Sequence, residues 1–543
     1  MALASSQSQA IASSNGLQEP VTGIPYQGYT PPGFTSTGTQ AVAAAESNAT
    51  MLALHRHMHP LFVKPLVWNG QIWAVDFAYG SRIVAEVDET RDAHVTRVWT
   101  GPQAAAVWAR GHYAPIFDSP WVVVPFALLF LVPFLDLRRL VRLRHLDALV
   151  VLSFLLSYWL FNNAHFEAGV WLAYPPLLYL LVRMLGIGLR PSKSDGGLAP
   201  WLSPRVLGIG LLILVAARVV LSLVDGLVID VGYASVIGAS HAIHGQSLYY
   251  TAVGHPDTYG PIAYLAYVPF VLLFPWHGTW DYLPAAHAAS LTFDLATVVG
   301  LVLLGRRLRP GRDGLRLGLA LGWAWAACPF TLMGLMEHSN DGLVAMLSVF
   351  ALLAFSSPAA RGALLGLATA AKFSPGALLP LFAGRRDRGW KGAVVCVASF
   401  AAVIVVSIGL YLPSGGLTEF YNHTIGFQMN RIDVFSPWGM HPGLAPLQKV
   451  LEFAAVALAL AVAIERRPRT LIQVCALAAA VTIAIQLPAT HWFYYYIIWF
   501  VPFVLVAVLG RATDAASIAD ERPEGDAIEI APTDHRVPAL VGG

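Results

Sequence analysis

Residues 206–224 read VLGIGLLILVAARVVLSLV, and this apolar run decides the class of fold. Its length is close to the ~20 residues that an α-helix needs to cross a bilayer. Residues 228–233 read VIDVGY and place Asp230 where this span meets its loop. An isolated acid there would be a solvated loop residue, but an ionisable group beside the membrane core is costly to keep and usually functional. The residues described below favour a functional role for Asp230.

The composition extends this conclusion to the whole chain. Of the 543 residues, 56% are hydrophobic and only 12% are charged, whereas a soluble protein carries about 25% charged residues. Apolar segments follow one another from Trp121 to the region of Arg511. The sequence therefore predicts a polytopic α-helical membrane protein with about 11–13 transmembrane helices.

Charge and cysteine content argue against two other classes. The net charge is only +2, and Arg residues cluster in short loops beside the apolar segments, so nucleic acid is not an expected partner. Cys328, Cys396 and Cys475 all lie in apolar runs, which argues against a disulfide framework or a thiolate metal site. We expect neither a metal nor a cofactor.

The N-terminal part is expected to differ from the rest. Residues 1–39 are rich in Ser, Gly, Gln, Thr and Pro, which is typical of disorder, and they contain no recognisable secretory signal. Residues 40–120 are expected to fold as a small domain that opens with a helix from Ala41 to about His59. Its strands are expected at residues 71–79, 83–87 and 95–99, with an acidic turn at 88–92. This pattern resembles a PepSY-type α+β module; a structural cap is the alternative.

Basic residues predict the orientation, because cytoplasmic loops collect Lys and Arg. The basic loops lie at residues 138–144, 306–316, 385–391 and 466–469. With the first and the last inside, the N-terminal domain and the Asp230 loop lie outside the cytoplasm, and residues 512–543 form a disordered cytoplasmic tail.

The loop 306–316 conflicts with this orientation if every segment from Gly260 to Gly384 crosses fully. Two departures remove the conflict. In the first, residues 260–275 are expected to be re-entrant, or to pair with residues 284–304 on the outer side. In the second, residues 362–383 are expected to form two half-helices that meet at Lys372, because a broken backbone is tolerated where it lines a cavity.

The first group of candidate site residues surrounds Asp230. Tyr233 follows it, a short interfacial helix is expected from Ala234 to Gly245, and Asp257 and Tyr259 precede the next apolar segment. Tyr is common at membrane interfaces, so these rings alone prove little. Metal binding is disfavoured because no HExxH or similar spacing connects the local histidines, which are His241, His244 and His255.

Two further groups lie between later segments. His338, Asn340 and Asp341 stand together, and Asp341 is either a substrate contact or a cap of the next helix. Lys372 lies at the centre of an apolar segment and needs an anionic partner or a wet cavity, with snorkelling as the alternative.

Two groups follow near the C-terminal end. Gln428 and Arg431 share one face of a helical turn, and the planar guanidinium group suits a phosphate. His491 opens the aromatic stretch 490–496, for which an aromatic belt is the alternative explanation.

Together these groups place carboxylates, a Lys and an Arg at the outer face of an apolar bundle. A carboxylate can take a proton from an acceptor hydroxyl, cations stabilise a departing phosphate, and a hydrophobic groove holds a polyprenyl tail. No P-loop or Rossmann fingerprint supports a cytosolic nucleotide donor.

At this point the sequence resembles the GT-C membrane glycosyltransferases. It is most similar to actinobacterial proteins near the polyprenol-phosphate-mannose-dependent α-mannosyltransferases of glycosyltransferase family 87. The similarity covers about residues 200–510, which form the predicted GT-C module (200–511), and residues 121–189 are expected to add three accessory transmembrane helices. The matching stretches are DVGYASVIGA at 230–239, GQSLY at 245–249, DTYGP at 257–261, SND at 339–341, KF at 372–373, Gln428 with Arg431, and FSPW at 435–438.

The resemblance implies roles for these residues. It implies a multi-pass protein of the plasma membrane whose extracytoplasmic site transfers a hexose, expected to be mannose, from a polyprenyl-phosphate carrier to an envelope glycan or glycolipid, with inversion. Asp230 is the implied base, and Lys372 and Arg431 are the implied phosphate contacts. The other expected substrate-binding residues are Tyr233, Asp257, Tyr259, His338, Asn340, Asp341, Gln428 and His491.

Two alternatives stay open from the sequence. A transporter or lipid-carrier flippase would use buried charges as a substrate path, but no inverted repeat is visible and the charges gather on one side. A sensor or scaffold with a degenerate transferase body is the other.

Overall fold

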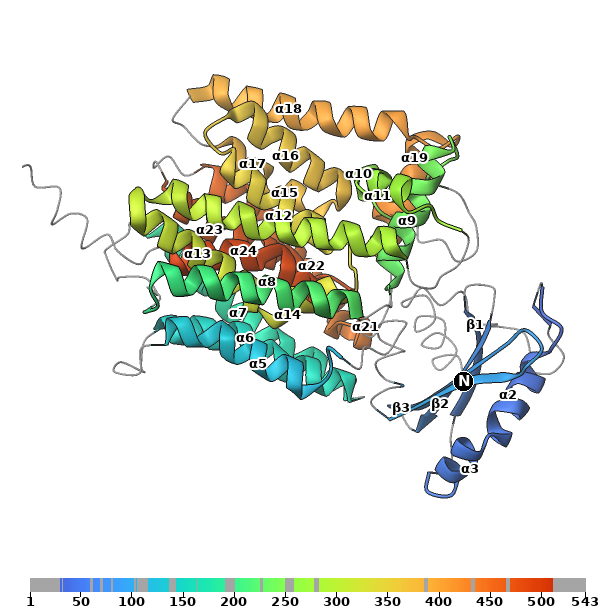
Figure 1. Cartoon of the computed structure of the whole chain (residues 1–543). Helices are drawn as coiled ribbons and strands as arrows, with labels where there is room; N and C mark the ends of the chain where they lie inside the picture. Colours follow the sequence, from blue (N-terminus) through green and yellow to red (C-terminus); the bar gives the residue numbers. More distant parts are fainter. Residues whose placement is uncertain are drawn as a thin grey trace, which may run out of the picture.

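The computed structural model describes residues 30–31, 33–58, 62–68, 72–79, 82–101, 104, 116–135, 143–163, 165–190, 201–224, 228–249, 258–277, 283–384, 389–430, 435–464 and 469–510. A small sheet with two helices lies beside one end of a large bundle of apolar helices (Figure 1). The predicted disorder of residues 512–543, and of residues 1–29, falls outside the described residues.

The N-terminal sheet is an antiparallel meander. Its strands, in spatial order, are β1 Phe62–Trp68, β2 Ile72–Tyr79, β3 Arg82–Glu89 and β4 Val95–Thr100. The last three correspond to the predicted strands. The sequence pattern does not predict β1, because Lys64 and Pro65 interrupt its apolar residues.

Two helices, α2 Gly38–Ser47 and α3 Ala49–His55, precede the sheet. Thr37 and Gln40 form a capping box at the start of α2. The single helix predicted from Ala41 to about His59 is broken at Asn48, which has an extended backbone. The Asn48 side chain accepts a hydrogen bond from the Thr50 N–H at 2.9 Å and so begins α3.

Acidic side chains are buried in this sheet. Asp76 lies opposite Glu86 in the β2–β3 register. Burial raises the pKa of Glu86 well above its usual 4.5, and the carboxylates of Asp76 and Asp88 raise this pKa further. Burial also raises the pKa of Glu89 from 4.5 to about 8. Asp88 and Glu89 end strand β3, so the turn predicted at 88–92 begins only at Thr90.

These pKa shifts predict that the N-terminal sheet loses stability between about pH 4.5 and pH 8. Glu89 is protonated in both folded and unfolded chains below this window, whereas within it the unfolded chain ionises first and is favoured. We expect hydrogen exchange of β2 and β3, corrected for intrinsic rates, to become faster across this window. Glu89→Gln should reduce the pH dependence, and an unchanged pH profile in this variant would contradict the assignment.

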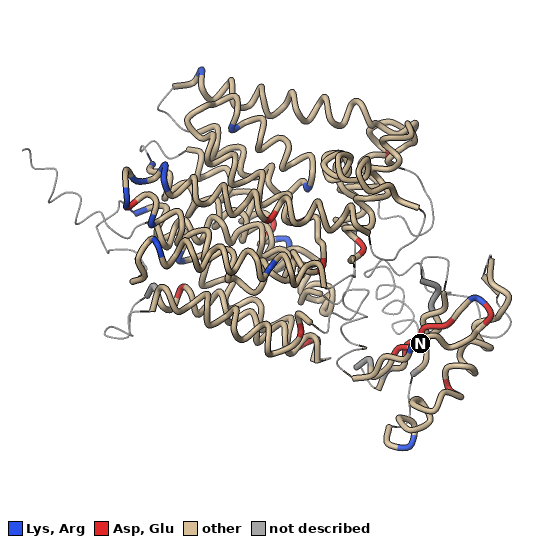
Figure 2. Tube along the Cα trace, viewed as in Figure 1, with Lys and Arg blue, Asp and Glu red and all other residues tan. Residues whose placement is uncertain are grey.

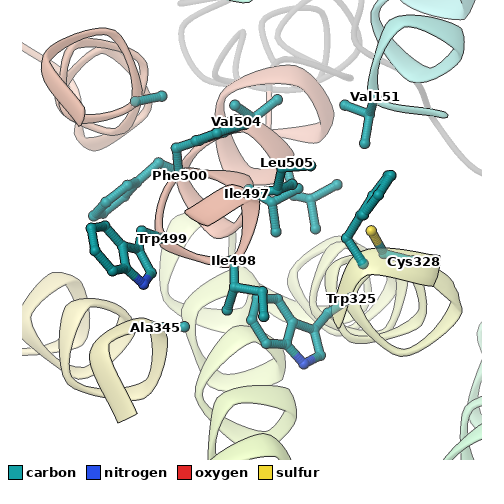
Figure 3. Packing of buried hydrophobic residues seen from close by; sticks show 14 of the residues in the cluster. Val151, Trp325, Cys328, Ala345, Ile497, Ile498, Trp499, Phe500, Val504 and Leu505 are labelled. Atoms are coloured by element: carbon teal, nitrogen blue, oxygen red, sulfur yellow. The ribbon is translucent and has the colours of Figure 1, made fainter. Parts of the chain in front are cut away.

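The bundle consists of helices that run roughly along one direction, with shorter helices at one end (Figure 1). Its helices are α5 Pro120–Leu131, α6 Leu143–Asn162, α7 Phe166–Leu189, α8 Pro204–Val224, α9 Asp230–Ile243, α10 Pro261–Leu265, α11 Val268–Leu273, α12 Pro284–Leu308, α13 Gly311–Ala327, α14 Pro329–Met336, α15 Asp341–Leu353, α16 Pro358–Ala371, α17 Leu379–Ala383, α18 Gly389–Leu410, α19 Gly416–Tyr421, α20 Phe427–Asn430, α21 Pro437–Met440, α22 Ala445–Ile464, α23 Leu471–Gln486 and α24 Ile497–Leu509. Figure 3 shows α24 packed among neighbouring helices, with Ile498 beside Trp325 of α13.

The helices confirm a polytopic α-helical membrane protein. In the described part of the chain, six helices are long and apolar enough to cross a membrane, or seven if α13 and α14, which are bent by 60°, count as one span. Six further apolar helices are only 10–17 residues long. By length and composition, six or seven of the predicted 11–13 spans are therefore supported among the described residues.

Both segments predicted to depart from a full crossing are broken. Residues 261–273 form two short helices, α10 and α11, which lie with α9 at one end of the bundle (Figure 1). Helix α16 ends at Ala371, Lys372 after it has an extended backbone, and the 3₁₀ turn η2 Ser374–Leu378 and α17 follow. The prediction of two half-helices meeting at Lys372 agrees with this break.

A buried ion pair crosses the bundle at Arg218, inside the apolar run 206–224. Its guanidinium group binds both carboxylate oxygens of Asp294 in α12, at 2.6 and 3.1 Å, and Arg218 is only 1% exposed. Arg218 also donates to the carbonyl oxygens of Ala326 and Thr331, on either side of the α13–α14 bend. The pair therefore fixes this bend to α8 and α12.

Arg218→Met should lower the free energy of unfolding by about 3–5 kcal/mol, because it leaves a buried carboxylate without its partner. Thermal unfolding of the detergent-solubilised protein measures this loss. The double variant Arg218→Met, Asp294→Leu replaces the pair by apolar side chains and should recover most of the stability. A double variant as unstable as the single one would contradict this account.

Candidate functional site

A cavity of about 600 Å³ opens where broken helices meet. It lies among the start of α9, the start of α15, the break after α16, helices α20 and α22, and the loop before α24. Six residues predicted from the sequence line it: Asp230, Tyr259, Asp341, Lys372, Gln428 and His491. Segments that are far apart in the chain therefore meet at one site.

Asp341 and Lys372 form a buried ion pair in the wall of this cavity. Lys372 Nζ lies 2.5 Å from Asp341 Oδ1, and the Trp499 indole N–H donates to the same oxygen at 2.7 Å. The Ser339 hydroxyl donates to Asp341 Oδ2. Both carboxylate oxygens are thus engaged, and the alternative of a helix cap is wrong, because Asp341 is the first residue of α15 and the N-cap position belongs to Asn340.

Lys372 does not snorkel to the surface. It is 7% exposed, and its ammonium group lies 5.0 Å from the ring centre of Tyr259 and 5.4 Å from that of Trp499. Cation–π contacts of this kind stabilise a desolvated amine. The described hydrogen bond uses one of the three N–H donors of an ammonium group, so Lys372 has capacity for an anionic ligand.

Asp230 begins helix α9 and is half-buried in the cavity wall. Its Oδ1 accepts the Val231 N–H at 2.8 Å. The helix starts at Asp230 itself, four residues before the interfacial helix expected from the sequence, because Ile229 has an extended backbone whose N–H donates to the Glu337 carbonyl oxygen. This bond holds Asp230 against the loop that precedes Asp341.

The close approach of this loop depends on Gly232. A Cβ atom there would lie 2.5 Å from the His338 carbonyl oxygen. Asn340 reinforces the contact, since its side-chain amide donates to Ser235 Oγ at 3.1 Å. The first and second predicted groups thus form one rigid wall.

Tyr259 is held over Lys372 by the residues around it. The Gly260 N–H donates to the Ala371 carbonyl oxygen at 3.2 Å, directly before Lys372. The hydroxyl group of Thr258, the residue before Tyr259, accepts a hydrogen bond from the Gln428 side-chain amide at 3.4 Å. Gln428 of α20 therefore joins the same wall.

Three predicted binding residues lie behind the wall. Tyr233 packs against Trp276, His338 lies against His287 with ring centres 3.5 Å apart and the rings tilted by 37°, and Asn340 is 1% exposed. Their place is structural support, and a direct substrate contact by any of them stays a prediction. Asp257 and Arg431 fall outside the described residues.

The sequence does not single out several lining residues. Trp499 and Tyr496 stack with ring centres 4.5 Å apart, and Tyr495 donates to the buried Glu337. In the sequence, the aromatic stretch 490–496 indicates part of this wall. Lys449 and Glu452 of α22 also line the cavity, and none of the sequence motifs contains them. Among the described residues, no group of three or more His, Cys, Asp or Glu side chains is placed to hold a metal.

These observations define a class of protein: a multi-pass membrane protein with an acid and an amine in one cavity of an apolar bundle. The sequence model of glycosyltransferase family 87 matches residues 258–491, somewhat under half of the chain. This segment therefore matches family 87, a GT-C type family, and the match supports a membrane glycosyltransferase. The match contains Tyr259, Asp341 and Lys372, and it begins after Asp230. No curated protein matches the chain.

Gly260→Ala should displace Tyr259 from Lys372. Its Cβ atom would lie 2.0 Å from the Ala370 carbonyl oxygen, a backbone atom that cannot turn aside. Overpacking of this kind costs about 1–3 kcal/mol, which thermal unfolding measures. Gly186→Ala in α7 is the matched control, because nothing lies within 4 Å of its Cβ atom. Equal stability of the two variants would contradict this packing.

Proposed function

We propose that the chain transfers a hexose, with mannose as the first candidate, from a polyprenyl-phosphate carrier to a hydroxyl of an envelope glycan or glycolipid. The reaction takes place at the extracytoplasmic face of the plasma membrane and inverts the anomeric carbon. The observation that carries this proposal is one cavity lined by both the half-buried Asp230 and the amine Lys372, in a bundle whose residues 258–491 match family 87.

Asp230 is the general base in this mechanism. It takes the proton of the acceptor hydroxyl as the acceptor oxygen bonds to the anomeric carbon. The bond from this carbon to the phosphate oxygen breaks on the opposite face, and the electron pair leaves with the polyprenyl phosphate. Asp341 is a poorer base, because its buried carboxylate is held in the ion pair with Lys372.

Lys372 stabilises the phosphate that leaves, with Arg431 as its proposed second contact. Asp341 and Trp499 position the Lys372 ammonium group, which a flexible lysine in water would not maintain. Tyr259, Gln428 and His491 line the remaining wall and are suited to sugar hydroxyls.

The distribution of charge supports the proposed side of the membrane. Figure 2 shows that Lys and Arg gather at the end of the bundle away from the N-terminal sheet. Helix α9, which begins at Asp230, lies at the end nearer that sheet (Figure 1). Because basic ends face the cytoplasm, this arrangement favours an extracytoplasmic Asp230.

Asp230→Asn should lower transfer by about 10²-fold or more, the usual contribution of a general base. Transfer of labelled mannose from polyprenyl phosphate in membranes that contain the protein measures this loss. Asp313→Asn, at an exposed carboxylate in the first turn of α13, should leave transfer unchanged. Substantial turnover by a well-folded Asp230→Asn variant would remove Asp230 from the mechanism.

A further inference from the structure

Helix α22 presents one of its faces to the cavity. The lining residues recur at intervals of one or three positions along the helix, which places them on one side of it. In order along the chain they are Gln448, Lys449, Glu452, Ala455 and Val456. This face is polar near the start of α22 and apolar further along, so it offers a charged position followed by an apolar path.

Lys449 and Glu452 form an exposed ion pair at the polar end of this face. Lys449 Nζ lies 2.8 Å from Glu452 Oε2, and the two side chains are 61% and 37% exposed. A solvent-exposed pair three residues apart on one helix is weak. The Lys372–Asp341 pair is buried and joins different helices. Of these two cavity lysines, Lys449 therefore exchanges its partner at lower cost.

The apolar end of the same face leads out of the cavity. Val456 lines the cavity and is 60% exposed, and Leu460, one turn further on, is 54% exposed. Next to this face, α22 is buried at Ala455, Ala459 and Val462, and the helix packs on α17 and α23. Lys449 and Val456 lie about 10 Å apart along the helix axis. The cavity thus opens at Val456 onto the apolar outer surface of the bundle.

We infer that Lys449 binds the phosphate of the lipid-linked donor in exchange for Glu452, and that Val456 leads its prenyl chain into the bilayer. This inference rests on the proposed function, because it concerns the donor of the same reaction. A single ligand with an anionic head and a long apolar tail binds the cation through its head and lies along the apolar path with its tail. The Lys449 ammonium group adds a cation at the cavity mouth to the deeper Lys372.

Binding of a long-chain polyprenyl monophosphate to the purified full chain tests the role of Lys449. Lys449→Gln should weaken binding about fivefold, the size of one charge-assisted hydrogen bond partly replaced by the amide. Glu452→Gln should strengthen binding, because it removes the competing carboxylate. A merely structural ion pair predicts the same sign for both variants, and that result, or an unchanged affinity in Lys449→Gln, would overturn the inference.

Two further ligands separate the head from the tail. The neutral polyprenol should bind equally to the wild-type chain and to Lys449→Gln. Inorganic phosphate should bind more weakly than the lipid, and Val456→Asn should not change its affinity. If inorganic phosphate binds as tightly as the lipid, the proposed path for the chain is wrong.

A matched pair of variants tests the apolar path. Val456→Asn should weaken binding of the long-chain lipid, whereas Val450→Asn should not, because Val450 is equally exposed at 62% but does not line the cavity. Equal effects at both positions would contradict the path. If the wild-type chain binds no polyprenyl phosphate, the proposed donor itself fails; if it binds and Lys449→Gln binds alike, only this inference fails.

Discussion

The cavity depends on one interaction, the ion pair between Lys372 and Asp341. It joins the break after α16 to the start of α15, and Trp499 ties it to α24. A single charge left alone in an apolar bundle would cost several kcal/mol, so neither residue is stable there without the other. The pair therefore links the start of α15, the end of α16 and helix α24, and the remaining cavity residues are arranged around it.

Broken helices are the second feature on which the site depends. In a membrane, irregular backbone is tolerated only where it packs on protein or lines a cavity. The loop before Asp341 satisfies this condition through the Ile229–Glu337 backbone bond. The α13–α14 bend satisfies it through Arg218, which binds carbonyl oxygens on both sides of the bend. Arg218 thus stabilises the scaffold, whereas the Lys372–Asp341 pair shapes the cavity.

The charges of the cavity differ in how firmly they are held. Asp341 accepts hydrogen bonds at both oxygens, so it is fixed in place and serves mainly to position Lys372. Lys449 and Glu452 lie at the exposed edge, where solvent and salt screen their attraction. The cavity thus has a rigid interior and an adaptable rim, which suits the lipid-linked donor that we propose.

The sequence by itself determined the class of protein, the break at Lys372 and six residues of the cavity wall, because apolar length and a lysine within it are local properties. It did not reveal the partner of Lys372, the Arg218–Asp294 pair or the contributions of Trp499 and Lys449. Asp341 and Trp499 are 158 residues apart, and Arg218 and Asp294 are 76 apart. Only the tertiary structure decided these pairings, because a buried charge pairs with a group that lies close to it in space. The spacing of residues along a chain without repeats does not encode that distance.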